Sequence, residues 1–493
     1  MKTHSRSAGT TTSRRRFLKT TAAAGLAGLG AGSLSARSWA NVQGANGDLR
    51  IAVIGFRSQG GGHINRVVGA SGARLAAICD VDQAVIDRRV ADLKGQNIEP
   101  KVYTDYRELC QDPDIDGVMI ATPNHTHTLI ALTAIAHGKH VYVEKPVAHN
   151  IHEGRKLVEG ARKRPELVVT HGQQGRSDTG WHRIMEWLQD KPLGEVVLSR
   201  GLNYKARQSI GSVGEPKEAP STVDYNLWCG PREMTPVNRR QFHYDWHWQW
   251  DFGNGDIGNQ GPHQLDVARW PLNQPVLPPR VMSLGQRWGY EDDGETANNQ
   301  LAFFDYQPVP LLFDNRGLPM REMDWRVMPV YKGVRVGNVI HCEGGHVIGG
   351  KAYDSDGKEV ESFSMTGGGS HLANWLGAIR AGKLEDPQLD LLHGHLAGGL
   401  AHLANLSYRL GKELDPNEVR ERLQGDKVGQ ETYENFLANL EANGIDPSQA
   451  PPVVGPWLEL DPETEEFRGE FADAAKALDA GVYRDEFKLP EIS

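Results

Sequence analysis

The chain has 493 residues, a formal net charge of −9 at pH 7, 39 % hydrophobic residues and 24 % charged residues. These proportions are typical of a globular protein with room for two domains, and nothing in them suggests a nucleic-acid partner. The four cysteines are scattered and form no Cys-x-x-Cys pair, so we expect no metal site and no disulfide.

The first 40 residues predict an export signal. The stretch SRRRFLK at 13–19 precedes an apolar, Ala/Gly-rich run over 20–34, and small residues flank a cleavage point at 38–40. This order is typical of a twin-arginine signal, and the run is too modest for a spanning helix. We therefore expect the twin-arginine translocase as a partner, a periplasmic or otherwise exported protein, and no membrane attachment of the mature chain. A basic N-terminal anchor is the alternative.

The rest of the chain is expected to form a nucleotide-binding domain over 47–174, a substrate domain over 175–442 and a tail over 443–493 that packs on the surface. In the first domain, an apolar strand pattern over 49–54 runs into the glycine-rich turn GFRSQGGG at 55–62, and a helix pattern follows.

This strand–turn–helix order is that of a dinucleotide fingerprint, whose backbone N–H groups approach a pyrophosphate at a helix N-terminus. The candidate cofactor-binding residues of the turn are Gly55, Arg57, Ser58, Gln59 and Gly60. Position 57 is Arg where the pattern GxGxxG has glycine, so an ordinary strand-to-helix turn stays an alternative.

A second strand pattern over 74–79 ends at Asp80, about 25 residues after Gly55, close to the spacing of a ribose-binding carboxylate. Such a carboxylate accepts hydrogen bonds from the adenosine ribose and repels a 2′-phosphate, which favours NAD over NADP. The alternative is a helix N-cap.

Two further strands, over 117–121 and 139–144, end in polar turns. The first leads into Thr122-Pro123-Asn124-His125 and the second into Glu144-Lys145-Pro146. A lysine at the carboxyl end of a parallel strand points into the crevice where open α/β sheets bind ligands. Because strands alternate with helix patterns, we predict a doubly wound parallel sheet.

Together these motifs resemble the Gfo/Idh/MocA family, named for glucose–fructose oxidoreductase and inositol dehydrogenase. Glu144-Lys145-Pro146 is the most specific of them, and the resemblance covers most of the chain from about residue 48. It implies an α/β protein with an N-terminal Rossmann domain and a C-terminal α+β domain. The second domain's sheet would be open and mostly antiparallel, with helices on one face.

The resemblance also implies NAD as cofactor and pairing of subunits through the open sheet face, hence a homo-oligomer. Thr122, Pro123, Asn124, His125, Glu144 and Lys145 would lie against the cofactor, with Asn124 and His125 near the nicotinamide ribose and Glu144 orienting Lys145 or the cofactor.

In the second domain we expect strands over 194–200, 281–288, 299–306, 309–313, 336–342 and 346–353, and helices over 181–189, 260–270, 370–381 and 394–411. The segment 243–263 gathers tryptophans, histidines and a glycine-rich turn. Aromatic faces stack on sugar C–H faces, while His, Asp and Asn bind hydroxyls, so we expect a small carbohydrate-like substrate. An aromatic core or a subunit interface is the alternative. The candidate substrate-binding residues are Arg176, His243, Trp246, Trp250, Asn259 and His263.

His263 matches the family histidine, whereas Asn259 stands where alcohol-oxidising members have Asp. An amide cannot accept a proton, so Asn259 can position a substrate but cannot act as a base. His263 would take the hydroxyl proton while Lys145 holds the oxygen. Lys145 could itself be the base, because a nearby nicotinamide cation depresses its pKa, and the sequence leaves these two assignments open.

The expected function is an NAD-dependent oxidoreductase that acts on a secondary alcohol of a sugar or sugar derivative. We expect NAD to be held tightly, because the periplasm has no known pool of free NAD to recharge the enzyme. Two alternatives stay open: an NAD-dependent glycosidase of the glycoside hydrolase family 109 type, which uses transient C3 oxidation, and a non-catalytic sugar-binding module.

Overall fold

Six short apolar segments form a parallel sheet in the first part of the chain. The computed structural model describes residues 47–322 and 324–493, so the expected export signal lies outside the described residues. The strands follow the order β3-β2-β1-β4-β5-β6, and their bounds are β1 (Leu49–Ile54), β2 (Ala73–Cys79), β3 (Lys101–Tyr103), β4 (Gly117–Ile120), β5 (His140–Val143) and β6 (Val169–His171). This order confirms the doubly wound Rossmann sheet.

Helices cover both faces of this sheet, which is why its central strands end in continuous apolar runs rather than alternating. They are α3 (Gln59–Gly69), α4 (Gln83–Lys94), α5 (Tyr106–Gln111), α6 (Asn124–Ala136) and α7 (Ile151–Arg162). Asp82 and Asp105 cap α4 and α5, each side chain accepting a hydrogen bond from a backbone N–H of the first turn.

The second sheet is mixed and mostly antiparallel, as expected; in its main path β7 and β10 pair in parallel and the other pairs are antiparallel. Its strands are β7 (Val196–Asn203), β8 (Arg280–Gln286), β9 (Asn299–Phe304), β10 (Leu311–Arg316), β11 (Val336–Cys342), β12 (Gly345–Ile348), β13 (Lys351–Asp354), β14 (Glu359–Ser362), β15 (Lys412–Glu413), β16 (Val453–Val454), β17 (Leu458–Leu460) and β18 (Phe467–Arg468). The single strand expected over 346–353 is a hairpin, because Gly349 and Gly350 both have positive φ and form a turn.

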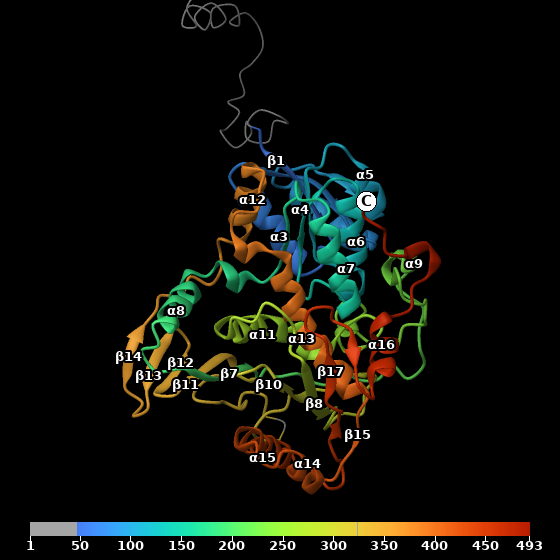
Figure 1. The fold of residues 1–493 in the computed structure, drawn as a ribbon. Coiled ribbons are helices and arrows are strands. Elements are labelled where there is room, and N and C mark those ends of the chain that lie inside the picture. Colours follow the sequence, from blue (N-terminus) through green and yellow to red (C-terminus); the bar gives the residue numbers. More distant parts are fainter. Residues whose placement is uncertain (1–46, 323) are drawn as a thin grey trace, which may run out of the picture. The chain divides into compact units, whose positions relative to one another are not determined.

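Helices pack on both faces of the second sheet, not on one (Figure 1). One face carries α11 (Gly261–Arg269) and α13 (Leu391–Arg409); the other carries α14 (Pro416–Arg422) and α15 (Lys427–Glu441). Successive residues of β9 alternate between the two cores: Ala302 and Phe304 pack with α13, and Leu301 and Phe303 with α15. The face through which the resemblance implies subunit pairing is therefore covered over β8–β10.

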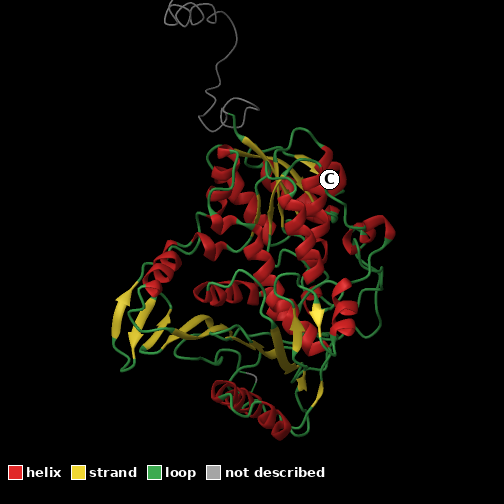
Figure 2. Ribbon diagram, in the orientation of Figure 1, coloured by secondary structure: helices red, strands yellow, loops and turns green. Residues whose placement is uncertain are grey.

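Helix α13 connects the two domains (Figure 2), because it contacts both α7 of the first domain and β8 of the second. Late parts of the chain also complete the Rossmann domain. From α12 (His371–Ala381), Trp375 is fully buried, and its Nε1 donates a hydrogen bond to the carbonyl oxygen of Val168 at 3.3 Å. Phe487 and Ile492 of the tail join the hydrophobic cluster of β4 and β5.

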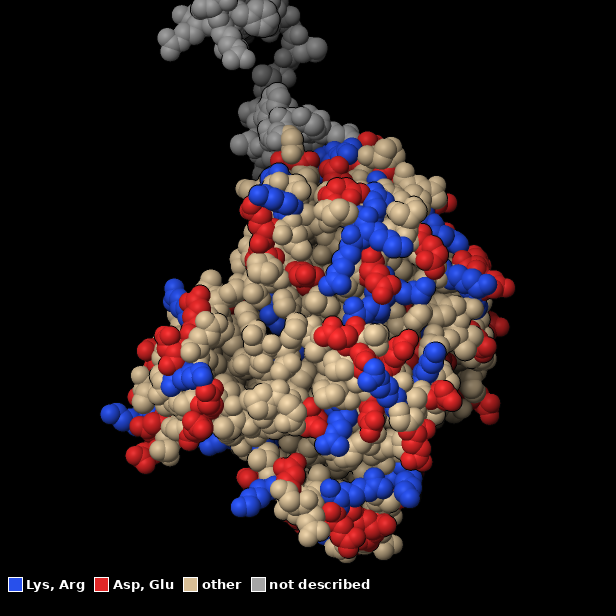
Figure 3. Space-filling model, in the orientation of Figure 1, with Lys and Arg blue, Asp and Glu red and all other residues tan. Residues whose placement is uncertain are grey.

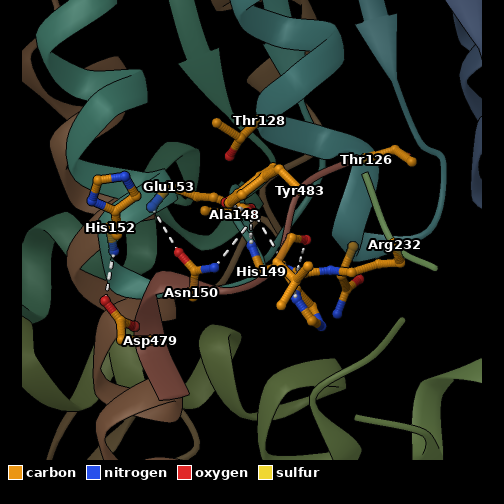
Figure 4. A network of polar contacts seen from close by, with 12 residues as sticks. Thr126, Thr128, Ala148, His149, Asn150, His152, Glu153, Arg232, Asp479 and Tyr483 are labelled. Carbon is orange, nitrogen blue, oxygen red and sulfur yellow. Dashed lines mark hydrogen bonds and ion pairs between the residues drawn. The ribbon is translucent and has the colours of Figure 1, made fainter. Parts of the chain in front are cut away.

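The tail also holds the start of α7 through buried polar groups (Figure 4). Asp479 lies in the last turn of α16 (Ala472–Ala480). It accepts hydrogen bonds from the backbone N–H groups of Ile151 and His152, at 2.9 and 3.0 Å. The Tyr483 hydroxyl donates to Glu153 at 2.6 Å. The tail is thus part of the fold, supplying strands β16–β18 and contacts to both domains.

The face shown in Figure 3 carries acidic and basic side chains interspersed. Across the described ranges 47–322 and 324–493, no helix has the length and apolar character of a membrane span, and no group of three or more His, Cys, Asp or Glu is placed to hold a metal ion.

Candidate active site

A cavity of about 560 Å³ lies at the carboxyl ends of β1, β2, β4 and β5, where the loops of the Rossmann sheet meet the second domain. The second domain contributes residues that follow β7, the 3₁₀ segment η2 (Asp245–Trp248), and the region where α10 (Gly255–Asn259) ends and α11 begins. The helix expected over 260–270 is therefore α11, preceded by a short separate helix.

The glycine loop forms one wall of the cavity and has no space for side chains at two positions. Gly55 has φ +76°, and a Cβ there would lie 2.7 Å from Thr122 Cγ2; a Cβ on Gly60 would lie 1.9 Å from the Gly55 carbonyl oxygen. The N-cap of α3, Ser58, makes no side-chain capping hydrogen bond, and the first turn carries no acid. The N–H groups of this turn can therefore bind a pyrophosphate.

Asp80 lies at the end of β2 in the same cavity. Its carboxylate oxygens accept hydrogen bonds from the backbone N–H groups of Phe56 and Asp82, at 3.0 and 3.2 Å. Burial raises the pKa of Asp80 to about 6. This is the place of a ribose-binding carboxylate, next to the glycine loop.

Glu144 positions the glycine loop. Its Oε1 accepts hydrogen bonds from His63 Nε2 at 2.8 Å and Gln59 Nε2 at 3.1 Å, both on α3, and its Oε2 accepts from the Lys145 backbone N–H at 3.2 Å. Burial opposes ionisation, but the hydrogen bond and charge of His63 hold the pKa of Glu144 at about 2. Glu144 therefore fixes the end of β5 to the first turns of α3.

Lys145 extends from the same strand end toward the second domain. Its Nζ donates a hydrogen bond to the backbone carbonyl oxygen of Asn259 at 2.7 Å. Burial lowers the pKa of Lys145. His263 lines the same cavity, and burial together with the charge of Lys145 lowers its pKa to about 4. A neutral imidazole and a partly desolvated ammonium therefore face the same space, which suits proton transfer at an alcohol.

Several of the other expected site residues also line the cavity. Thr122, Pro123, Arg57, Ser58 and Gln59 do so, and Trp246 does so from η2. Asn124 lines it as well, with Nδ2 donating to Asn254 Oδ1 at 2.9 Å. His243 also lines the cavity, and its Nε2 lies 2.8 Å from Oδ2 of Asp82, whose backbone N–H donates to Asp80.

Four expected site residues do not line the cavity: Gly60, which packs against the Gly55 carbonyl group, and Arg176, His125 and Trp250. Arg176 is 2 % exposed, forms a bidentate ion pair with Asp266 (2.6 and 2.8 Å) and stacks on Trp270, so it connects the linker after β6 to α11. His125 is buried between Trp228 and Phe252, and its Nε2 donates to the Trp228 carbonyl oxygen.

Trp250 lies beside a second cavity of about 360 Å³, where the Arg409 guanidinium covers its ring at 4.9 Å.

The cavity contains residues that the sequence did not single out: Gln174, Lys205, Arg207, Tyr244, His247 and Gln260. Arg207 forms an ion pair with the buried Asp256, whose Oδ1 accepts hydrogen bonds from Nε at 2.9 Å and from Nη2 at 2.8 Å. The signal for Lys205 and Arg207 was two cations that follow shortly after the end of strand β7.

Family models match both domains. Residues 49–171 match the oxidoreductase family, NAD-binding Rossmann fold, and residues 184–284 match the oxidoreductase family, C-terminal alpha/beta domain. An inositol 2-dehydrogenase of Salmonella typhimurium is 29 % identical over 159 residues, which are 32 % of this chain and 46 % of that protein. A glycosyl hydrolase family 109 protein of Shewanella sp. strain MR-4 is 40 % identical over 156 residues, 30 % of this chain and 33 % of that protein.

The chain therefore spans about half, or less, of the length of these curated relatives. The WlbA dehydrogenase from Bordetella pertussis, solved in complex with NADH and UDP-GlcNAcA, shares the fold with a TM-score of 0.53 and 16 % identity, over 72 % of this chain and 96 % of that one. Residues 49–171 and 184–284 thus match the two domains of the Gfo/Idh/MocA oxidoreductase family in the order of the chain, and the first of them matches its NAD-binding Rossmann domain.

Proposed function

We propose that this chain is an NAD-dependent oxidoreductase that acts on a secondary alcohol of a sugar or polyol and holds NAD tightly. One observation carries the proposal: Lys145 and a neutral His263 face one cavity beside a glycine loop at the carboxyl ends of the Rossmann strands. The relatives named inositol 2-dehydrogenase support a polyol as the substrate class.

The residues present fit NAD. Gly55 and Gly60 bring the backbone close where a Cβ has no space, the first turn of α3 has neither a side-chain cap nor an acid, and Asp80 offers a carboxylate for ribose hydroxyls. When bound, NAD supplies the redox chemistry of the reaction.

The proton chemistry belongs to the chain. The Lys145 ammonium would donate a hydrogen bond to the reacting oxygen and stabilise negative charge that develops there. His263, neutral at pH 7, would accept the hydroxyl proton. The lowered pKa of Lys145 also suits it as the base, while Asn259 contributes its backbone carbonyl, which holds Lys145 in place.

The test is an absorption and fluorescence spectrum of the purified protein, recorded before and after a panel of sugars and inositols is added. A reduced-nicotinamide band near ~340 nm that rises with a polyol and falls with the matching ketone supports the proposal. Bound nucleotide that no sugar reduces would favour a non-catalytic sugar-binding module. Absence of nucleotide even after denaturation would contradict tight NAD binding.

A redox-neutral glycosidase is the second candidate, and the 40 % identity with a glycosyl hydrolase family 109 protein favours it. In that case a glycoside would release its aglycone with no net formation of reduced nicotinamide. A panel of chromogenic glycosides assayed beside the spectrum distinguishes the two candidates.

We also propose export through the twin-arginine pathway, on the pattern of residues 13–40. Replacing both Arg14 and Arg15 by Lys should keep the protein in the cytoplasm of a host with that translocase, as cell fractionation and immunoblotting would show. Export of this double variant at the wild-type level would contradict the proposal. A homo-oligomer is proposed too, and light scattering would test it.

A further inference from the structure

The imidazole of His247 is held rigidly at the cavity. His247 lies on η2, and the indole of Trp246 stacks on its ring with centroids 3.7 Å apart and planes 18° apart. The rings of Tyr244 and Trp248 lie 5.0 and 5.6 Å from it. A ring packed in this way keeps its two nitrogens in fixed directions.

One of these nitrogens has its proton assigned by its partner. His247 Nδ1 lies 2.5 Å from the backbone carbonyl oxygen of Tyr244. A carbonyl oxygen can only accept a hydrogen bond, so Nδ1 carries the proton and Nε2 keeps its lone pair.

Within the described ranges no group donates a hydrogen bond to that lone pair. Nε2 is not shielded from solvent, and His247 lines the cavity, so a bound molecule can reach this nitrogen. Burial and the charges of Lys145 and Arg207 lower the pKa of His247 to about 3, which keeps the ring neutral at pH 7.

His263 differs from His247 in this respect. Its ring has no hydrogen-bond partner among the side chains described, so neither tautomer is selected, which suits a group that takes and returns a proton. The charge of Lys145 lowers the pKa of both histidines, so both lie near its ammonium. Near each other in the cavity therefore lie the Lys145 ammonium, which is a donor, and His247 Nε2, which is an acceptor of fixed direction.

We infer that His247 is a specificity-determining residue whose Nε2 accepts a hydrogen bond from a second hydroxyl of the substrate, beside the oxygen held by Lys145. The inference rests on the proposed function and narrows its substrate class to neutral polyols with at least two free hydroxyls. An ether, ketone or carboxylate oxygen in that place has no proton to donate, and its lone pairs would face the lone pair of Nε2.

The first test does not need turnover. Nitrogen NMR of the ¹⁵N-histidine-labelled protein, with His247→Asn to assign the signal, should show His247 in the Nδ1–H tautomer. Adding glucose, galactose or myo-inositol at high concentration should shift the Nε2 signal for at least one of them. An Nε2–H tautomer, or no shift with any of these polyols, would overturn the inference.

The second test uses the polyol of this panel that wild type oxidises, together with its monodeoxy analogues. His247→Asn keeps a donor toward Tyr244 O and removes the Nε2 acceptor, so kcat/KM for the full polyol should fall roughly 10- to 100-fold. One analogue lacks the hydroxyl that His247 binds, and wild type should oxidise it slowly. The variant should oxidise this analogue at the same rate as wild type, because losing the hydroxyl and losing Nε2 remove the same hydrogen bond.

If His247→Asn lowered kcat/KM by the same factor for the full polyol and for every analogue, His247 would only support the fold of the site. That result would overturn the inference. His346→Asn is the matched control, because His346 also stacks on an aromatic ring, Tyr353 at 5.4 Å, but lies on β12 outside the cavity. It should change neither kcat nor KM. If wild type oxidises no polyol, the proposed function fails, and the NMR test alone decides the role of His247.

Discussion

Glu144 and Lys145, two neighbouring charged residues at the end of β5, contact different parts of the protein. Glu144 accepts hydrogen bonds from α3 and so holds the glycine loop, whereas Lys145 crosses to the second domain and donates to the Asn259 carbonyl oxygen. The glycine loop and the proposed catalytic ammonium are therefore positioned by adjacent residues at the end of one strand. A change at either one should affect a different property of the enzyme.

Replacing Lys145 by Met should reduce turnover about 10²- to 10⁴-fold, because the donor to the reacting oxygen is lost. NAD content should not change, since no glycine-loop contact involves Nζ. Single-turnover reduction of bound NAD and nucleotide release on denaturation measure the two quantities.

Lys139→Met is the matched control at the opposite end of the strand, where Nζ donates to the carbonyl oxygens of Asp112 and Ile115. It should lower stability while each folded molecule keeps its turnover. Wild-type turnover in the Lys145 variant would contradict the assignment.

NAD affinity should depend on the protonation of Asp80. Because burial raises the pKa of Asp80 to about 6, the carboxyl gains a proton as pH falls from 7 to 5 and loses acceptor capacity for ribose hydroxyls. NAD should therefore bind more weakly at pH 5 than at pH 7, as fluorescence titration of nucleotide-free protein would show. Asp80→Asn should weaken binding roughly 10- to 100-fold at pH 7 and remove this dependence. A pH profile shared by wild type and variant would argue against Asp80.

At the scale of elements, local patterns were predictable and distant partners were not. The strand–turn–helix order at 49–69 and the charged end of β5 were visible because they depend on neighbours in sequence. Arg176 lies outside the cavity because it pairs with Asp266 on α11, and no local pattern of the sequence indicates that pairing. The helices on the second face of the large sheet were not expected. Both faces of β9 are buried, so its residues do not alternate between apolar and polar, and no pattern shows which face a helix covers.

The start of α3 should tolerate no side chain at Gly60, where a Cβ would lie 1.9 Å from the Gly55 carbonyl oxygen. Gly60→Ala should push the loop away from β1 and abolish retention of NAD. Gly69→Ala, at the end of the same helix, meets no atom within 4 Å and should stabilise the protein by up to ~1 kcal/mol with NAD retained. Nucleotide content and urea unfolding measure both variants. Full NAD retention in the Gly60 variant would show that the loop does not need this close approach.

At the scale of the whole molecule, the end of the chain joins the two domains. The tail adds β16 and β17 to the edge strand β8, caps α7 through Asp479 and fills the Rossmann core with Phe487. Stability of the nucleotide domain should therefore depend on residues far outside it.

Asp479 should make stability depend on pH. Burial raises its pKa to about 7 in the folded protein, so its contribution is fully present below about pH 4 and is lost as pH rises through 7. The slope is at most ~1.4 kcal/mol per pH unit. Asp479→Asn keeps an oxygen for the N–H groups of α7 and stays neutral, so its free energy of unfolding should vary less between pH 4 and 8 and exceed that of wild type at pH 8.

Asp485→Asn is the control for this prediction, because the Asp485 side chain is 93 % exposed on the same tail. It should leave the pH dependence as in wild type. Denaturant unfolding across the pH range gives both curves, and identical curves for wild type and Asp479→Asn would contradict the assignment.

The contribution of the tail to the Rossmann core also sets the order of events during synthesis. Phe487 and Ile492 share one hydrophobic cluster with Val118 and Val141, which leave the ribosome long before them. Until these last side chains emerge, the nascent sheet keeps part of its apolar core open to water and to chaperones. Completion of the nucleotide-domain core therefore waits for the tail segment that carries Phe487 and Ile492.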